Sequence, residues 1–152
     1  MAYLSAGTAP PSGCFLCAAR TPDDDRRHHV VARRGRAFLM LNAYPYASGH
    51  VMAVIHSHVG TVEQVETAEL GDAFALVREA TVALAAEYRA EGFNIGMNQG
   101  RVAGAGVPDH LHVHVVPRWH GDMNFMPVLG DVRVLPETLD QTWERLRGRL
   151  GR

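Results

Sequence analysis

The feature that most restricts the fold of this chain is the segment from His110 to Val116, in which histidines alternate with aliphatic residues. Side chains of a β-strand point alternately to its two faces, so the alternation predicts a strand with three imidazoles on one face. These are His110, His112 and His114. Burying three polar rings side by side without partners would cost several kcal/mol, so this face indicates a functional site and not a core.

Imidazoles at this spacing suit two kinds of chemistry. They can hold a tetrahedral zinc ion, or they can bind and attack a phosphate. The loop from Gln99 to Pro108 is rich in glycine, which lets backbone N–H groups approach an anion closely. No obvious glutamate follows the histidines to act as the general base of a zinc enzyme. The neighbourhood therefore favours phosphate.

The composition indicates a single domain. The chain has 152 residues, of which 47% are hydrophobic, and this suffices for a core of its own. Residues 1–13 lack periodicity, so we expect a flexible N-terminal tail followed by one domain over residues 14–152. The segment 26–36 is rich in arginine and is expected to form a solvated loop or turn.

Charge and hydropathy argue against two classes of partner. The formal net charge of −1 provides no global basic field that would hold a nucleic acid. No apolar run approaches the ~20 residues of a membrane-spanning helix, and the N-terminus lacks a secretory signal. We therefore expect a cytoplasmic protein with no nucleic-acid or membrane partner. In a reducing compartment, the C-x-x-C pair Cys14 and Cys17 suggests metal or redox chemistry more than a disulfide.

The remaining periodicity indicates strands flanking one main helix, and hence an α+β fold. Short apolar or alternating runs predict strands over residues 37–41, 50–56, 93–97 and 110–116. A helix is expected from about Thr67, with Gly92 at its C-terminal end and an apolar stripe formed by Leu70, Phe74, Val77, Thr81, Leu84 and Tyr88. A final amphipathic helix is expected from Pro136.

The segment 110–116 matches the H-x-H-x-H-x-x signature of the histidine triad family of nucleotide hydrolases and transferases, which the chain resembles over most of its length. Asn42 with residues 45–50 is similar to the family's upstream loop. Residues 98–100 with 103–106 are similar to its phosphate loop.

Two further segments, 116–119 and 121–125, resemble the diadenosine polyphosphate hydrolases and phosphorylases of this family more than its phosphoramidases. The resemblance implies cleavage of substrates such as diadenosine tetraphosphate at the α-phosphate, through a covalent nucleotidyl-histidine that water or phosphate resolves. It also implies a five-stranded antiparallel sheet in each subunit. Two subunits would form a homodimer with a continuous ten-stranded sheet, with the main helix near the seam.

The resemblance also implies roles for four histidines. The central His112 would be the nucleophile, and a neutral imidazole can attack at pH 7 because its ordinary pKa is about 6.5. His114 would donate a hydrogen bond as negative charge develops on the phosphate. His110 flanks the nucleophile, and His50 is similar to the family's fourth histidine, which would orient the triad or the leaving group.

Other residues would contact the phosphates and the ribose. Asn98, or the adjacent Gln99, would orient phosphate oxygens beside the loop glycines Gly104 and Gly106. Asn42 would hydrogen-bond the ribose, with a loop asparagine that caps its own backbone as the alternative.

The remaining candidates concern the bases and the leaving group. The base would be lined by members of the set Phe38, Leu39 and Leu41. Trp119 would stack on the second nucleoside, or else serve packing or the dimer contact. Arg118 would contact phosphate or pair with Asp122.

Cys14 and Cys17 with two distant histidines would form an ordinary tetrahedral zinc site of structural role, as in some family members. By position the partners are His58 and His110, with His56 as the alternative to His58. The reaction itself would need no cofactor.

Three alternative functions remain at this point. A phosphoramidase or an adenylyl sulfate-splitting enzyme would use the same nucleotidyl-histidine. A zinc hydrolase would use His110, His112 and His114 as ligands, but it leaves the glycine-rich loop unexplained. A nucleotide-binding module without turnover would have no use for an intact His112.

Overall fold

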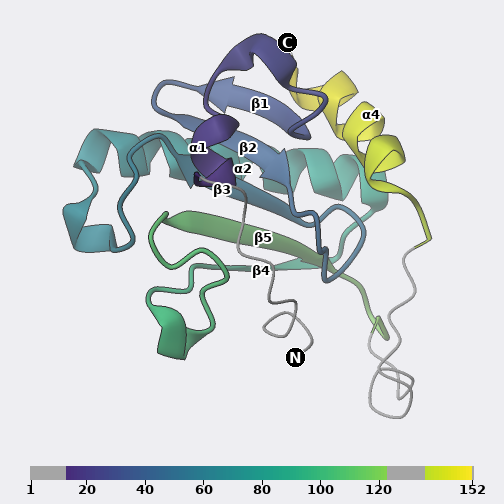
Figure 1. The fold of residues 1–152 in the computed structure, drawn as a ribbon. Helices are drawn as coiled ribbons and strands as arrows, with labels where there is room; N and C mark the ends of the chain where they lie inside the picture. The colour runs from purple at the N-terminus through teal and green to yellow at the C-terminus, as the bar shows by residue number, and fades with distance from the viewer. Residues whose placement is uncertain (1–12, 123–135, 152) are drawn as a thin grey trace.

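The computed structural model describes residues 13–122 and 136–151, which form a five-stranded antiparallel sheet with helices on both faces (Figure 1). The α+β class expected from the periodicity and the five-stranded antiparallel sheet implied by the resemblance are confirmed. Residues 1–12 of the predicted tail lie outside the described residues. The strands lie in the order β1-β2-β3-β5-β4 and comprise β1 (Val30–Arg34), β2 (Ala37–Leu41), β3 (Val51–Ile55), β4 (Gly92–Gly96) and β5 (His112–Arg118).

Three α-helices surround this sheet in the described residues. Helix α2 (Thr67–Tyr88) crosses one face, and the short α1 (Phe15–Ala18) lies on the other (Figure 1). Helix α4 (Leu139–Leu150) packs beside β1 and against α2. Single helical turns occur at Pro22–Asp24, Val62–Gln64 and Arg101–Ala103.

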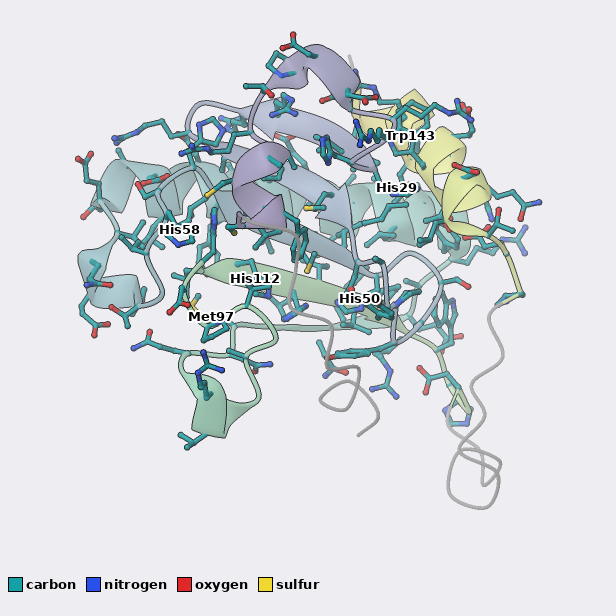
Figure 2. All side chains as sticks on the ribbon, in the orientation of Figure 1. His29, His50, His58, Met97, His112 and Trp143 are labelled. Carbon is teal, nitrogen blue, oxygen red and sulfur yellow. The ribbon has the colours of Figure 1, made fainter. Side chains whose placement is uncertain are left out.

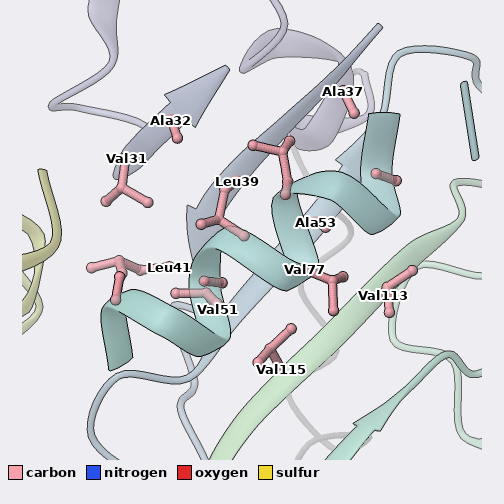
Figure 3. Close-up of a cluster of buried hydrophobic side chains, with 14 of the residues drawn as sticks. Val31, Ala32, Ala37, Leu39, Leu41, Val51, Ala53, Val77, Val113 and Val115 are labelled. Carbon is pink, nitrogen blue, oxygen red and sulfur yellow. The ribbon is translucent and has the colours of Figure 1, made fainter. Parts of the chain in front are cut away.

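The alternation of strand residues separates two apolar clusters. The larger cluster, under α2, includes Leu39, Leu41, Val51, Val113 and Val115 (Figure 3). Their sequence neighbours point the other way, and this second face carries Phe38, Met40, Met52 and Val54, packed against Leu16 of α1. We call it the histidine face, because the β5 histidines described below share it.

The apolar stripe predicted on α2 is rotated relative to the observed one. The buried residues include Ala73, Ala80 and Ala83 beside Leu76 and Leu84, whereas Phe74 is 48% exposed. Small alanine side chains let the helix axis approach the sheet closely, so the helix buries its alanine-rich side. A prediction based mainly on the large apolar residues of the helix therefore places its buried stripe to one side of the observed one.

The helix ends also differ from the expected ones. Helix α2 stops at Tyr88, because Arg89 adopts a left-handed conformation (φ 53°), and Gly92 instead begins β4. Helix α4 begins at Leu139 and not at Pro136, because Thr138 and Gln141 form a reciprocal capping box that fixes its start.

The arginine-rich segment 26–36 contains a strand that the sequence analysis missed. Val30 and Val31 are fully buried in β1, so the expected solvated loop is wrong for this part. The outer edge of β1 is covered by α4, since Trp143 Nε1 donates to the Val30 carbonyl at 2.9 Å and Arg147 donates to that of Val31. Of the two sheet edges, β4 is therefore the one left without such a helix.

Candidate active site and metal centre

Two of the three alternating histidines, His112 and His114, form the polar centre of the histidine face. Strand β5 pairs with β3 so that His112 lies opposite Val54 and His114 opposite Met52. The rings of His112 and His114 meet edge to face, with centroids 4.8 Å apart. Figure 2 shows His112 on β5 and His50 at the start of β3, on the side of the sheet that carries α1. These two strands therefore build the polar centre of the face.

The backbone fixes the protonation pattern of His112. Its Nδ1 lies 2.9 Å from the carbonyl oxygen of His110, which can only accept a hydrogen bond. The proton of a neutral His112 must then sit on Nδ1, and Nε2 keeps its lone pair. Burial lowers the pKa of this imidazole, which is 6% exposed, so the neutral form is favoured. His112 thus has a free nucleophilic nitrogen near neutral pH.

A chain of hydrogen bonds fixes His114 in the opposite form. The backbone N–H of Tyr46 donates to His50 Nδ1 at 3.1 Å, so the proton of a neutral His50 is on Nε2. That nitrogen lies 3.0 Å from His114 Nδ1, which must accept. The remaining proton of His114 is therefore on its own Nε2. His112 consequently presents a lone pair on its Nε2, and the neighbouring His114 presents an N–H donor on its Nε2.

We expect NMR spectroscopy to show His114 as a neutral imidazole with its proton on Nε2. Burial, with a smaller contribution from His112, lowers the His114 pKa from 6.5 to about 4. The unfolded chain takes up this proton at a higher pH than the folded chain does, so the group reduces stability as the pH falls from 6.5 towards 4. A ¹H–¹⁵N titration measures both properties. A titration midpoint near 6.5, or a proton on Nδ1, would contradict the hydrogen-bond chain.

The ring of His110 belongs to a different group of side chains on the same side of the sheet. His110 precedes β5, is fully buried, and turns its Nδ1 toward Cys14 Sγ at 3.3 Å and Cys17 Sγ at 3.5 Å. His58 Nδ1 lies 3.3 Å from Cys17 Sγ and 3.4 Å from His110 Nδ1. The ring of His110 therefore lies on the side of the sheet that carries α1, but these contacts hold it with the two cysteines and His58, apart from the rings of His112 and His114.

The four-residue cluster has the dimensions of a zinc site. All four donor atoms lie within 4.8 Å of one another. A tetrahedral zinc ion with bonds of ~2.3 Å to sulfur and ~2.0 Å to nitrogen separates its donors by about 3.3–3.7 Å. The distances between His110, His58 and the thiols fall at this scale. The residues present therefore fit a zinc ion.

Neighbouring groups favour the same interpretation. His110 Nε2 lies 2.8 Å from the Ile55 carbonyl oxygen and donates a hydrogen bond to it. The lone pair of a neutral His110 is therefore on Nδ1, which is directed at the cluster. His56, the alternative ligand, is not part of the cluster; its ring packs near Phe38, with centroids 5.9 Å apart. His58 is thus the residue that the fold brings to the cysteines.

The expected base-lining residues divide between the two faces. Phe38 is fully buried on the histidine face, whereas Leu39 and Leu41 belong to the cluster under α2. The assignment of Leu41 to the base is therefore wrong, because strand alternation turns its side chain away from His112. Met40, which is not among the expected residues, shares the face of Phe38, and the period of two along β2 is enough to identify it.

Asn42 follows β2 and is 2% exposed. Its Oδ1 accepts the N–H of Tyr44 at 2.9 Å, which is the local capping interaction named as the alternative. Its Nδ2 has no hydrogen-bond partner in the described residues. A buried amide donor without a partner is costly, so Asn42 retains a group suited to an oxygen of a ligand.

The glycine-rich loop holds the two amide candidates in different ways. Asn98 lies beyond the end of β4, and its Nδ2 donates to the Gly104 carbonyl at 3.4 Å. Gln99 is tied to another loop, since its Oε1 accepts the N–H of Val62 and its Nε2 donates to Glu63. Asn98 is therefore the less constrained of the two.

Arg118 and Trp119 are both engaged within the chain. Arg118 forms a two-bond ion pair with Asp122, at 2.6 and 2.7 Å, and also donates to Asn94. Trp119 Nε1 donates to the Tyr88 carbonyl at 3.0 Å. Of the alternatives open in the sequence, the pairing of Arg118 with Asp122 is the one observed, and Trp119 packs against the end of α2.

Comparison with known proteins identifies the family. Residues 24–121 match the model of the HIT domain, so the chain belongs to the HIT domain family. A zinc-bound histidine triad family protein from Mycobacterium smegmatis superposes with a TM-score of 0.73 at 22% identity, covering 91% of this chain and 94% of that one. This likeness supports the fold.

Two curated relatives carry names from the dinucleoside polyphosphate branch. An AP-4-A phosphorylase of Mycobacterium tuberculosis is 40% identical over 118 residues, 78% of this chain and 60% of the relative. An asymmetrical bis(5'-nucleosyl)-tetraphosphatase of Schizosaccharomyces pombe is 33% identical over 95 residues, 62% of this chain and 52% of the relative. The chain thus spans less than two thirds of the length of either protein.

The helices in the described part of the chain are too short or too polar to span a membrane.

Proposed function

We propose that this protein cleaves dinucleoside polyphosphates, such as diadenosine tetraphosphate, at the α-phosphate through a covalent nucleotidyl-histidine. The observation that carries the proposal is the pair of complementary rings on β5. His112 keeps a lone pair on Nε2, because its proton is on Nδ1, which donates a hydrogen bond to the His110 carbonyl. His114 carries a proton on Nε2, because His50 donates to its Nδ1. A nucleophile and a hydrogen-bond donor beside one another suit phosphoryl-type transfer.

The reaction follows from these two protonation states. His112 Nε2 attacks the α-phosphorus, a P–N bond forms, and the P–O bond to the polyphosphate leaving group breaks. The His114 Nε2–H stabilises the negative charge that develops on oxygen during this step. Water or inorganic phosphate then attacks the same phosphorus, the P–N bond breaks, and His112 is restored. His50 holds His114 in the donor form throughout.

Other residues hold the nucleotide in this proposal. Met40 contacts one base on the histidine face, and the fully buried Phe38 belongs to the apolar cluster that supports it. The unpartnered Nδ2 of Asn42 donates to a ribose oxygen. Asn98, with the glycine-rich loop that contains Gly104 and Gly106, orients the phosphate oxygens. Trp119 is left to packing, since its indole N–H already donates to Tyr88.

The cluster of Cys14, Cys17, His58 and His110 holds a structural zinc ion in this proposal. When bound, zinc crosslinks the N-terminal segment to the residues that precede β5 and takes no part in the chemistry. His110 connects the zinc site to the catalytic histidine. Its ring is a zinc ligand, and its backbone carbonyl accepts the hydrogen bond from His112 Nδ1. A cytoplasmic setting suits the site, because reducing conditions keep the two thiols available.

The proposed enzyme is a homodimer in which the β4 strands of two subunits pair. The edge of β1 is covered by Trp143 and Arg147 of α4, whereas residues 94–96 of β4 are exposed and Ile95 is 47% exposed. An open edge with an exposed aliphatic residue can pair with a second strand, and this supports the ten-stranded sheet expected from the resemblance.

Product analysis tests the proposed activity. The purified protein is incubated with diadenosine tetraphosphate, with and without inorganic phosphate, and the nucleotides are separated by ion exchange. ADP with ATP, formed only with phosphate, would identify a phosphorylase; AMP with ATP in water would identify an asymmetrical hydrolase. No turnover of this substrate, with turnover of adenosine phosphoramidate or adenylyl sulfate, would favour the alternative branches instead.

The other alternative classes are less well supported. A zinc hydrolase that uses all three triad histidines as ligands requires the ring of His110 beside those of His112 and His114. In the described residues, the ring of His110 lies with Cys14 and Cys17 instead. A module without turnover leaves the complementary protonation states of the β5 histidines unexplained.

A further inference from the structure

Glu69 is a charged residue in an unusual position. It lies in the first turn of α2, is 0% exposed, and both carboxylate oxygens are occupied by Ser57. Oε1 accepts the backbone N–H of Ser57 at 2.8 Å, and Oε2 accepts its hydroxyl at 2.6 Å. Burial opposes ionisation of Glu69, but the hydrogen bonds from Ser57 outweigh it and hold the pKa below its ordinary value. The carboxylate is therefore ionised and forms charge-assisted bonds.

The residue next to this contact is His58. It is the exposed member of the metal cluster and belongs to no helix or strand. The chain is held on both sides of it, because Glu69 binds Ser57 and the Val59 carbonyl accepts the N–H of Leu111 at 2.8 Å. A ligand in a loop loses less conformational freedom on binding a metal when its backbone is already fixed.

Gly60 completes this packing. A Cβ atom at Gly60 would lie 2.2 Å from the Pro108 carbonyl oxygen, so the loop approaches the segment before His110 more closely than any side chain allows. The segment 56–60 is therefore a preformed loop, held by Glu69 at one end and packed against residues 108–111 at the other.

We propose that Glu69 is a positioning residue of the metal centre, which presets His58 as a ligand by fixing Ser57. The inference rests on the proposed zinc site and goes beyond it by assigning a role to a buried carboxylate on a different element. Glu69 does not touch the ion. It acts through the backbone, and its loss makes the fourth ligand mobile while Cys14, Cys17 and His110 stay in place.

The test compares zinc affinity and ligand geometry in Glu69→Gln and the wild type. Glutamine has the same shape but no charge and only one acceptor oxygen, so both bonds lose their charge assistance and the bond to the Ser57 hydroxyl can form only with its direction reversed. Zinc binding by the reduced full-length chain is measured by competition with a chromophoric chelator. We expect the dissociation constant to rise by about 10- to 100-fold, the range for residues that orient metal ligands. Cobalt substitution gives a second readout, because its visible spectrum reports a tetrahedral site with two thiolates and two imidazoles.

Asp72→Asn is the matched control. Asp72 lies on the same helix and accepts the N–H of Arg36 at 2.9 Å, so it also holds a loop, but one that carries no metal ligand. We expect this variant to keep the wild-type zinc affinity and cobalt spectrum. Ser57→Ala removes the hydroxyl contact but keeps the charge-assisted bond from the backbone N–H, so it should weaken zinc binding less than Glu69→Gln does. This second variant keeps the test informative if the first folds poorly.

The possible results separate the two proposals. A wild-type chain that binds no zinc would overturn the metal site itself, and with it the role of Glu69. A wild-type chain that binds zinc, with unchanged affinity in both Glu69→Gln and Ser57→Ala, would overturn the positioning role alone. Equal weakening in Asp72→Asn would also overturn it, since the effect would then follow general destabilisation of the helix contacts.

Discussion

Replacing His112 with alanine is expected to lower kcat for diadenosine tetraphosphate by roughly 10⁴-fold or more, the scale of loss when a covalent nucleophile is removed. The methyl group leaves no nucleophilic atom in the site, and His114 has its proton, not its lone pair, on Nε2, so it cannot substitute. Initial rates measured by product separation give kcat and KM. The substrate-binding residues stay in place, so KM should change much less than kcat.

His120→Ala provides the control for this variant. His120 lies on the surface two residues beyond β5, and its backbone N–H donates to the Glu91 carboxylate, a bond that alanine keeps, so the substitution should leave both kinetic constants unchanged. The zinc content of His112→Ala should equal that of the wild type, because the nucleophile is not a ligand. Retention of more than about a tenth of wild-type kcat in His112→Ala would be incompatible with a nucleotidyl-histidine on this residue.

The strands that build the site could be predicted because their signal is local. In β5 the side-chain period of two follows from backbone geometry, so the placement of His112 and His114 on one face required no knowledge of distant residues. That Phe38 shares this face depends on how β2 pairs with β3 and β3 with β5. The same rule, applied strictly, also separates Phe38 from Leu39 and Leu41. The assignment of Leu41 to the base failed because the rule was not carried through β2.

The partners of His110 could not be read from the alternation. The period of two gives the face to which a side chain points, but not the distant residues that it meets there. The ring of His110 is held by Cys14, which lies 96 positions away in the sequence, and by the Ile55 carbonyl. The C-x-x-C pair did indicate this partner, but only the folded chain shows that the ring of His110 lies with the cysteines and not beside those of His112 and His114.

The missed strand β1 illustrates a second limit. Its arginines mimic a solvated surface, yet Arg33 is partly buried and donates to Asp25 and to the carbonyls of Ala19, Arg20 and Thr21. The guanidinium thus ties the N-terminal segment to the sheet. A charged residue in a sequence predicts an exposed position only if the fold does not surround its side chain with hydrogen-bond acceptors. Here the acceptors come from other parts of the chain, so the sequence around the arginine does not show them.

Replacing Cys17 with serine is expected to abolish stoichiometric zinc binding and to lower the melting temperature by roughly 10 °C, because a structural zinc ion contributes several kcal/mol to folding. A serine hydroxyl is a poor zinc ligand beside the thiolate that it replaces. The loss should reach the active site as well, since the ring of His110 would be freed while its carbonyl still holds the His112 proton. We therefore expect a lower kcat, from a smaller fraction of correctly oriented His112.

Chelation distinguishes loss of the metal from loss of the side chain. Removing zinc from the wild-type chain should lower its melting temperature to that of Cys17→Ser, whereas the variant should not respond to the chelator, because it has no ion to lose. Metal analysis of the untreated wild type should give one zinc ion per chain. A wild type without zinc, whose melting temperature the chelator leaves unchanged, would mean that the thiols and imidazoles hold one another by hydrogen bonds alone. The orientation of His112 would then depend on the packing of residues 108–111 and not on a metal.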